Sequence, residues 1–458
     1  MNIFKRTAKR LDIIAHSQSA GEFFDNITDN TFDCIAALPI LFWLLHMVSV
    51  LGSAVYLRFR VLVLRHYPLD IKAMVPSILL CYGIMLFILI GKSIRSGKKL
   101  KDRIKDNPVY VLFFIAMVWM LIAVIADGWT DISLFGDANR NEGVLSYWGY
   151  IAVLFFSGSL IRNDKVKRFL ADVTLTLSLA VFVYALWHFY YYKPLIDIST
   201  NEDYPSAVFI HFNHYGYYLA VNIMLAAMLF AVTLRLKRKV FYLICFSANT
   251  VMLNLNDTFG AWLACAVGFI FALIAFAIKD KRFNLKVFAA FVVFIAVTIV
   301  MTLMGHGQLN DLFHFFSDVK EVASDPSGAD DAGTDRWALW KATVGYIKER
   351  PLFGFGIEGI DKRLDAAAGS ERTHNEYLQY AVTFGIPEAV AYTAACIGVF
   401  VRNLRRKKLL SGVTLACLTV AFTFLVSACF GITLYNTSPY LFIFLGLGYR
   451  SVKAREMI

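Results

Sequence analysis

The sequence predicts an all-α, polytopic integral membrane protein with about twelve transmembrane helices and one long external loop containing amphipathic helices. Two observations lead to this fold class. Hydrophobic residues make up 58% of the 458 residues, and they recur in runs of about 18–25, each long enough to cross a hydrocarbon core of about 30 Å. Lys and Arg lie between alternate runs, the distribution expected when cytoplasmic loops are positive.

The formal net charge of +11 would suit nucleic acid, but its placement indicates membrane topology, and no nucleic-acid partner is expected. The basic clusters are Lys5–Arg10, Arg95–Lys105, Arg162–Arg168, Arg235–Lys239, Lys279–Lys286, Arg402–Lys408 and Arg450–Arg455. All seven cysteines fall within or at the ends of apolar runs without paired spacing. Neither a disulfide framework nor a metal site is therefore expected.

The apolar runs give the order of the spans. They are expected at 33–57, 73–94, 108–126, 144–161, 169–192, 208–234, 240–256, 260–278, 287–304, 376–401, 409–429 and 435–449. An even number of spans with basic ends places both termini in the cytoplasm. The segment Arg58–Lys72 does not fit this topology, because it would place four basic residues on the external side. Either it is interfacial or the first hairpin is interpreted wrongly.

Four regions follow from this order. They are a cytoplasmic N-terminal segment (1–32), transmembrane helices 1–9 (33–304), an external loop with interfacial helices (305–374), and transmembrane helices 10–12 with a short cytoplasmic tail (375–458). The external loop holds more acids than bases, opposite to the cytoplasmic loops. Helices are predicted over Leu309–Ala323 and Asp335–Glu349, and Arg350-Pro351 ends the second. Amphipathic helices of this kind often rest in the headgroup layer.

The end of the external loop holds the residues best suited to chemistry. Thr373-x-x-Glu376 reads as a capping box, which would put His374 in the first helical turn. Free amides at a helix start attract anions, and a histidine with a pKa of about 6.5 can act as a base near neutral pH. The alternative is an interfacial histidine without a catalytic role.

Two arginines on the external side are candidate anion ligands. Arg336 lies among tryptophans in a predicted helix. We expect it either to bind a phosphate through its planar guanidinium or to form a surface ion pair with Asp335. Arg140 is a lone base in its external loop, flanked by glycines. His211 and His214 lie three residues apart at the start of the sixth span, and polar lining of a cavity is favoured there over metal binding.

These segments together resemble the bacterial O-antigen ligase and O-antigen polymerase superfamily. The resemblance rests on their order and placement. The segments are Phe135-Gly136-x-x-x-Arg140-x-x-Gly143, Asn213-x-x-Gly216-x-x-Leu219, Arg336 with Trp340, Pro351-Leu352-Phe353-Gly354-Phe355-Gly356, and His374-Asn375-Glu376-Tyr377-Leu378-Gln379. The likeness covers most of the chain in topology and about Arg336–Gly385 in specific motifs.

The resemblance implies an inverting, metal-independent glycan transfer without a cofactor, at the outer face of the cytoplasmic membrane of a bacterium. The donor would be an oligosaccharide on undecaprenyl pyrophosphate, and the acceptor a glycan or glycolipid. His374 would act as the base or position the acceptor, while Arg336 and Arg140 would neutralise the pyrophosphate. The sugar and acceptor ligands would be Asn213, His214, Trp340, Asn375 and Tyr377.

Ligase and polymerase differ only in the acceptor, and protein glycosylation is a further possibility within the same chemistry. The alternative from another class is a transporter or flippase of the lipid-linked oligosaccharide. A transporter is expected to carry polar residues through several spans and a repeated architecture. Here the polar residues gather at one face and in one loop, which favours the enzyme.

Overall fold

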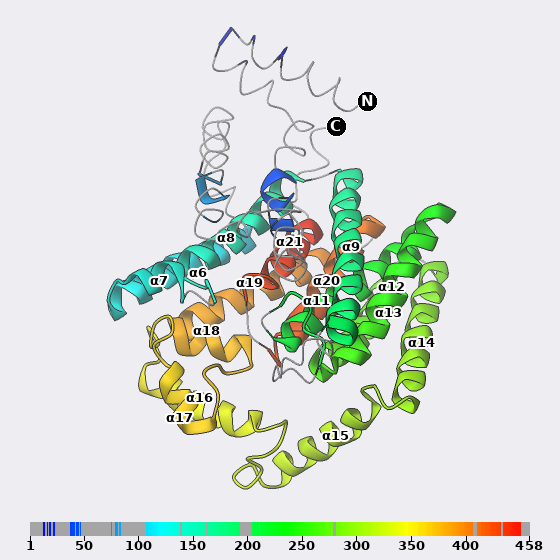
Figure 1. Cartoon of the computed structure of the whole chain (residues 1–458). Coiled ribbons are helices and arrows are strands. Elements are labelled where there is room, and N and C mark those ends of the chain that lie inside the picture. The colour runs from blue at the N-terminus through cyan, green and yellow to red at the C-terminus, as the bar shows by residue number, and fades with distance from the viewer. Residues whose placement is uncertain are drawn as a thin grey trace.

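The computed structural model describes residues 12–13, 16, 18–19, 22, 37–41, 43–44, 46, 75, 78–80, 82–83, 107–137, 140–161, 163–192, 204–209, 211–277, 281–405, 410–431 and 434–449. Over these ranges the chain forms helices joined by turns, with no strand, so the all-α prediction is confirmed (Figure 1). Most of the first two predicted spans, 33–57 and 73–94, lies outside the described residues. So do Arg58–Lys72 and most of 1–32.

Most predicted spans correspond to helices of similar bounds. These are α6 (Pro108–Asp127), α8 (Val144–Phe155), α9 (Asp164–Trp187), α11 (Phe212–Val232), α12 (Leu236–Asn256), α13 (Phe259–Ala277), α14 (Lys281–Leu303), α20 (Gly412–Ser427) and α21 (Ser438–Gly448). π-Helical turns, η1 (Phe156–Leu160) and η2 (His188–Tyr192), extend α8 and α9. Among the described helices, those within Pro108–Asp127, Asp164–Tyr191, Phe212–Val232 and Asn284–Leu303 are long and apolar enough to cross a membrane.

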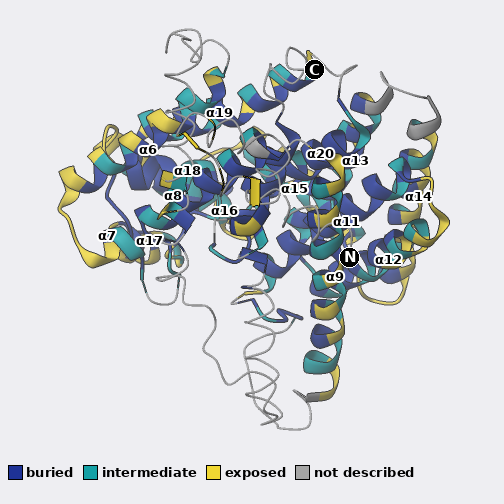
Figure 2. Cartoon of the chain, turned by 90° about the horizontal axis from the view of Figure 1, so that it is seen from above, coloured by how far each residue is buried: buried dark blue, intermediate teal, exposed yellow. Residues whose placement is uncertain are grey.

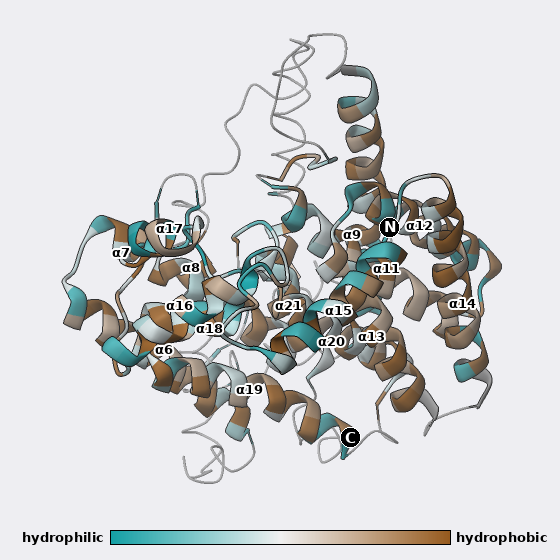
Figure 3. Ribbon diagram, turned by 90° about the horizontal axis from the view of Figure 1, so that it is seen from below, coloured by the Kyte–Doolittle hydropathy of each residue, from teal (hydrophilic) through white to brown (hydrophobic). Residues whose placement is uncertain are grey.

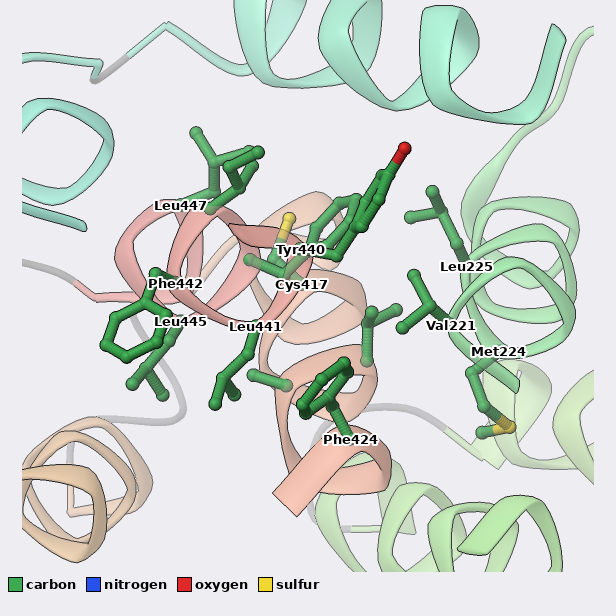
Figure 4. Close-up of a cluster of buried hydrophobic side chains, with 14 of the residues drawn as sticks. Val221, Met224, Leu225, Cys417, Phe424, Tyr440, Leu441, Phe442, Leu445 and Leu447 are labelled. Atoms are coloured by element: carbon green, nitrogen blue, oxygen red, sulfur yellow. The ribbon is translucent and has the colours of Figure 1, made fainter. Parts of the chain in front are cut away.

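Helix α11 is the centre of the bundle. It packs against α12, α13 and α20, and α20 packs in turn against α21, so nearly every residue of α11 is buried (Figure 2). Figure 4 shows Val221, Met224 and Leu225 of α11 turned toward side chains of α20 and α21. In lipid such contacts depend on close van der Waals packing. A Cβ at Gly268 of α13 would lie within 3 Å of Thr423 on α20, so glycine is required there.

The predicted span 376–401 is wrong as a single helix. The chain instead forms α18 (Glu376–Phe384) and α19 (Ile386–Leu404), which are separated at Gly385 with φ of 92°. A Cβ at Gly385 would collide with the carbonyl of Leu352, because the turn after α16 packs against this break. The two helices also contact one another.

The external region is folded rather than a loose loop. It contains α15 (Leu309–Ser324), α16 (Arg336–Glu349) and α17 (Asp361–Ala368), and the short helix α7 (Asp131–Phe135) precedes α8. Helices α16, α17 and α18 share a small core of their own, made of Leu339, Ile347, Phe355, Ile360, Leu364, Ala381 and Val382. Figure 3 looks onto this end of the bundle, where hydrophilic residues gather between the apolar helices.

Candidate functional site

A pocket of about 400 Å³ opens at the start of α11. Its wall is built from the α7–α8 connection, the start of α11, the end of α17 with the segment that follows, and the chain after α20. The lining residues are Arg140, His211, Asn213, His214, Tyr217, Asp365, Gly369, Ser370, Glu371, Arg372, His374 and Gly431. Segments more than 200 residues apart in sequence therefore meet in one polar cavity.

The start of α11 contributes two of the predicted ligands, Asn213 and His214. His211 caps the helix, and its Nδ1 accepts a hydrogen bond of 3.2 Å from the Asn213 amide. His214 is 7% exposed, and its Nδ1 has no hydrogen-bond partner among the described residues. Tyr217 packs against Gly431, where a Cβ would lie within 3 Å of the tyrosine oxygen. The glycine therefore lets the wall close around the ring.

His374 precedes α18 instead of occupying its first turn, so the predicted capping box is wrong. Asn375 is the N-cap, and its Oδ1 accepts a hydrogen bond of 3.1 Å from the Leu378 amide. The Glu376 amide donates to a carbonyl just after α20, at 2.9 Å. Both amides are thus used within the protein. His374 itself has a φ of 48°, a left-handed conformation that is uncommon outside glycine and concentrates at functional sites.

The imidazole of His374 is neutral near pH 7. Burial, the charge of Arg336 and the neighbouring His211 lower its pKa to about 4. Burial disfavours the charged form, and a nearby cation opposes a second positive charge. A ring nitrogen of His374 is consequently free of a proton and can accept one. Any anion that offsets the charge of Arg336 would raise this pKa and strengthen the base.

Helix α16 positions both His374 and Arg336. The Trp340 indole donates a 2.9 Å hydrogen bond to the carbonyl of Thr373. On the other side, the Thr373 amide donates to Gln379 Oε1 at 3.1 Å. Arg336 lies four residues before Trp340, so both project from one face of the helix. The same helix face therefore anchors the histidine segment and brings a cation beside it.

The guanidinium of Arg336 has no carboxylate within ion-pair distance among the described residues. Its Nη1 donates to the carbonyl of Gly333 at 3.2 Å and contacts Thr334 Oγ1 at 3.4 Å. The predicted alternative, an ion pair with Asp335, is not formed. Arg336 is only partly exposed, and its positive charge remains available to an anion.

Arg140 and Arg372 are paired with acids instead. Arg140 Nη1 donates to Glu358 and Asp361, both at 2.6 Å, and its Nη2 donates to Glu371. Arg372 is 7% exposed and donates to Glu358 at 2.5 Å. These contacts join the α7–α8 connection to the segment around α17. Two cations of the pocket wall are thereby neutralised in part.

Glu358 and Asp361, the two inner acids of this cluster, have pKa values that are shifted in opposite directions. Burial and the hydrogen bond with Asp361 raise the pKa of Glu358 to about 7, against the charges of Arg372 and Arg140. For Asp361, burial would raise the pKa, but the hydrogen bond from Glu358 and the same two arginines lower it. Despite the desolvation that favours its neutral form, the pKa of Arg140 is raised by Glu358 and Asp361. Arg140 is therefore charged at all working pH values.

Four predicted site residues lie outside the pocket lining: Arg336, Trp340, Asn375 and Tyr377. Asn375 caps α18 and Trp340 holds the histidine segment, as described above. Tyr377 donates a 2.9 Å hydrogen bond to the carbonyl of Leu425, toward α20. Arg372 was missed from the sequence, although it lies two residues before His374. Over the described ranges, no three side chains of His, Cys, Asp or Glu are grouped in a way that could hold a metal ion.

Comparison with known families identifies a segment that contains half of the pocket lining, His374 included, together with Arg336. Residues 241–393 match the family described as O-Antigen ligase. No curated protein matches the chain. The matched segment runs from α12 to α19 and includes Arg336, Trp340, Arg372 and His374. With the helical bundle and the apolar spans, the match supports the predicted relationship: the chain is a membrane protein, and its residues 241–393 form a segment similar to the O-antigen ligase family.

Proposed function

We propose that this protein is a membrane glycan ligase or polymerase. It transfers an oligosaccharide from undecaprenyl pyrophosphate to an acceptor glycan or lipid at the outer face of the cytoplasmic membrane, by an inverting and metal-independent reaction. The observation that carries the proposal is a neutral histidine in a polar pocket beside Arg336, an arginine without a carboxylate partner among the described residues. This arrangement suits a reaction that takes up a proton and releases an anion.

In the proposed reaction an acceptor hydroxyl attacks the anomeric carbon of the donor sugar. A new C–O bond forms as the bond to the pyrophosphate oxygen breaks on the opposite face, and the leaving group departs with the electron pair. His374 accepts the hydroxyl proton. Its pKa of about 4 applies to the pocket without an anion, and a bound pyrophosphate would offset Arg336 and raise that value. Binding of the donor would thus make His374 a stronger base for the reaction.

Arg336 is the proposed main stabiliser of the developing negative charge on the leaving pyrophosphate. Arg140 is the proposed second ligand. Of its three acids, Glu371 is the most exposed, with 58% of its side chain accessible, against 15% for Glu358 and 11% for Asp361. The Glu371 contact is therefore the one most readily exchanged for a phosphate oxygen, while the other two keep Arg140 in place.

Asn213 and His214 are proposed to contact the sugar or acceptor, since both line the pocket. Trp340, Asn375 and Tyr377 act in this proposal chiefly by holding the histidine segment and α18, through the hydrogen bonds already described. This differs from the direct sugar contacts implied by the family resemblance. A conservative substitution at these three positions would therefore change the catalytic rate more than the affinity for substrate.

The proposed topology has twelve spans with both termini in the cytoplasm and residues 305–374 outside. In this topology the N-terminal segment 1–32 is cytoplasmic, and the transmembrane helices lie in 33–304 and 375–458, as the charge pattern predicts. In support, the start of α11, the end of α12 and the external helices α15–α17 lie toward the same end of the bundle in Figure 1. The pocket lies at that end, where the headgroup of a lipid-linked donor would be found.

The experiment that tests this function uses the purified chain in liposomes with a short oligosaccharide on undecaprenyl pyrophosphate. Release of lipid pyrophosphate and the length of the glycan product are followed together. A ladder of lengthening products identifies a polymerase, and release only after a distinct acceptor is added identifies a ligase. No release from several donors, with movement of the donor across the bilayer, would overturn the enzyme proposal in favour of a flippase.

A further inference from the structure

Helix α15 is the least covered helix of the external region. None of its residues is buried. Three large apolar side chains on it are strongly exposed: Phe313 is 74% accessible, Phe316 is 62% and Val319 is 50%. Their spacing of three residues places them on one face. Large side chains in such a row seldom face water in a soluble region.

Apart from Lys320, which falls among the apolar side chains, the residues of α15 divide into an apolar and a polar half. At 100° per residue, the exposed apolar side chains fall on the same side as Leu309 and Leu312. Asn310, His314, Ser317 and Glu321 fall on the opposite side and are exposed as well. Helices of this kind lie in the plane of a membrane surface, with the apolar side in the acyl boundary.

The start of α15 is held at the outer surface of the bundle. Only Met304–Gln308 separates it from α14, a predicted span. Gln308 Nε2 donates a hydrogen bond of 2.5 Å to Asp257, at the end of α12. Nearly two turns into the helix, the Phe315 ring lies 5.6 Å from that of Phe259 at the start of α13.

The exposed apolar surface of α15 continues that of α14. Leu303 and Met304, at the end of α14, are 83% and 67% accessible. Further along α14, Ile299 and Val300 are exposed too. In a spanning helix such side chains face lipid. The exposed apolar side chains of α14 and those of α15 are therefore suited to the same occupant.

From these observations we infer that α15 lies in the outer headgroup layer of the bilayer, with Phe313, Phe316 and Val319 in contact with lipid. Helix α16 has a different role, because its tryptophan indoles donate to protein carbonyls: Trp337 to Pro326 and Trp340 to Thr373. Of the two amphipathic helices predicted in the external loop, the membrane contact is assigned to α15.

Helix α15 also sets the position of Arg336. Asp318, on its polar half, accepts a 2.9 Å hydrogen bond from the Gly333 amide. The carbonyl of the same Gly333 accepts from Arg336 Nη1 at 3.2 Å. One residue thus joins the membrane helix to the candidate phosphate ligand. If the donor is lipid-linked, as the proposed function holds, α15 keeps Arg336 at the depth of the donor pyrophosphate.

Spin-label accessibility in liposomes tests the membrane contact without any need for activity. Labels are attached to Phe316→Cys and, as the matched control on the polar half, to Ser317→Cys in the full chain, with the signal of the unsubstituted protein subtracted. We expect the label at 316 to be relaxed by oxygen and shielded from a water-soluble nickel chelate, and the label at 317 to show the reverse. Equal access of the chelate to both labels would overturn the inference. Shielding of the label at 316 from both reagents would also overturn it, since protein rather than lipid would then cover this face.

A second measurement tests the link to Arg336. Phe316→Asp places a charge in the lipid layer, and Ser317→Asp places it in water. We expect the KM for a full-length lipid-linked donor to rise roughly tenfold in the first variant and less than twofold in the second. An unchanged KM in Phe316→Asp would contradict the link. If the unsubstituted protein turns over no donor, the proposed function fails, while the accessibility result still decides whether α15 lies in lipid.

Discussion

Replacement of Arg140 by alanine tests how the pocket wall is held together. Arg140 bridges Glu358 and Asp361 at 2.6 Å and also contacts Glu371. Its loss would leave the two inner acids with Arg372 as their remaining arginine partner. Breaking a buried ion pair from one side costs about 3–5 kcal/mol, because the other charge stays desolvated. Arg140 keeps 23% of its side chain accessible, so we expect the lower part of that range, about 3 kcal/mol.

The assay is equilibrium unfolding in mixed detergent micelles, followed by tryptophan fluorescence. Glu349→Ala is the matched control, because it breaks an ion pair with Arg363 at 3.4 Å in which both side chains are more than half exposed. Such a pair contributes about 0–1 kcal/mol. We expect Arg140→Ala to lower the free energy of unfolding by several times more than the control does. Equal losses in the two variants would refute the assignment of a buried, structurally coupled cluster.

Three further predictions concern the pocket. Trp340→Phe keeps an aromatic ring but removes the indole donor, and we expect a loss of about 1 kcal/mol in transition-state stabilisation, a roughly fivefold fall in kcat with little change in KM in steady-state kinetics. Gly431→Ala forces a methyl group against Tyr217 and should destabilise the protein by about 1–3 kcal/mol in thermal unfolding. Gly345→Ala is the control: its new methyl group would have no other atom within 4 Å, and it should stabilise the protein by up to about 1 kcal/mol. The pKa of Glu358 is raised from 4.5 to about 7, so between these pH values the folded state holds a proton that the unfolded state has released. This group therefore lowers the stability of the fold as pH rises from 4.5 through 7. Glu358→Gln should remove that part of the stability–pH curve, and an unchanged curve would contradict the raised pKa of Glu358.

The bundle helices could be predicted from the sequence because their ends are marked locally. Charged or polar residues and Pro108 delimit the apolar runs, so α6 and α13 begin and end within one residue of the predicted bounds, whereas α14 begins six residues earlier than predicted. The break at Gly385 lies within an apolar run, but Gly385 and Pro387 mark it locally, since glycine commonly ends a helix and proline favours the first turn of the next. It depends on the turn that contains Leu352, more than thirty residues earlier, whose carbonyl fills the space beside the glycine.

The candidate site was predicted in part. His374 and Arg336 both belong to the external segment that the sequence marks as the candidate site, whereas the observed cap of α18 is Asn375 and not the predicted Thr373. Thr373 and Asn375 are both good capping residues, and local sequence does not distinguish them. The partners of Arg140 were missed for a different reason: Glu358 lies 218 residues away. Long-range ion pairs leave no periodic signal, and only the folded chain brings them together.

The most direct test of the central claim is single-turnover release of lipid pyrophosphate in proteoliposomes. His374→Ala and Arg336→Ala are compared with two external controls, His314→Ala on the polar half of α15 and Arg363→Ala on α17, at equal insertion. Loss of a catalytic base or of a charge stabiliser costs about 10²- to 10⁴-fold. We predict that both site variants release pyrophosphate at least 100-fold more slowly, with the controls within about twofold of the unsubstituted protein. Full release rates in His374→Ala and Arg336→Ala would contradict the account.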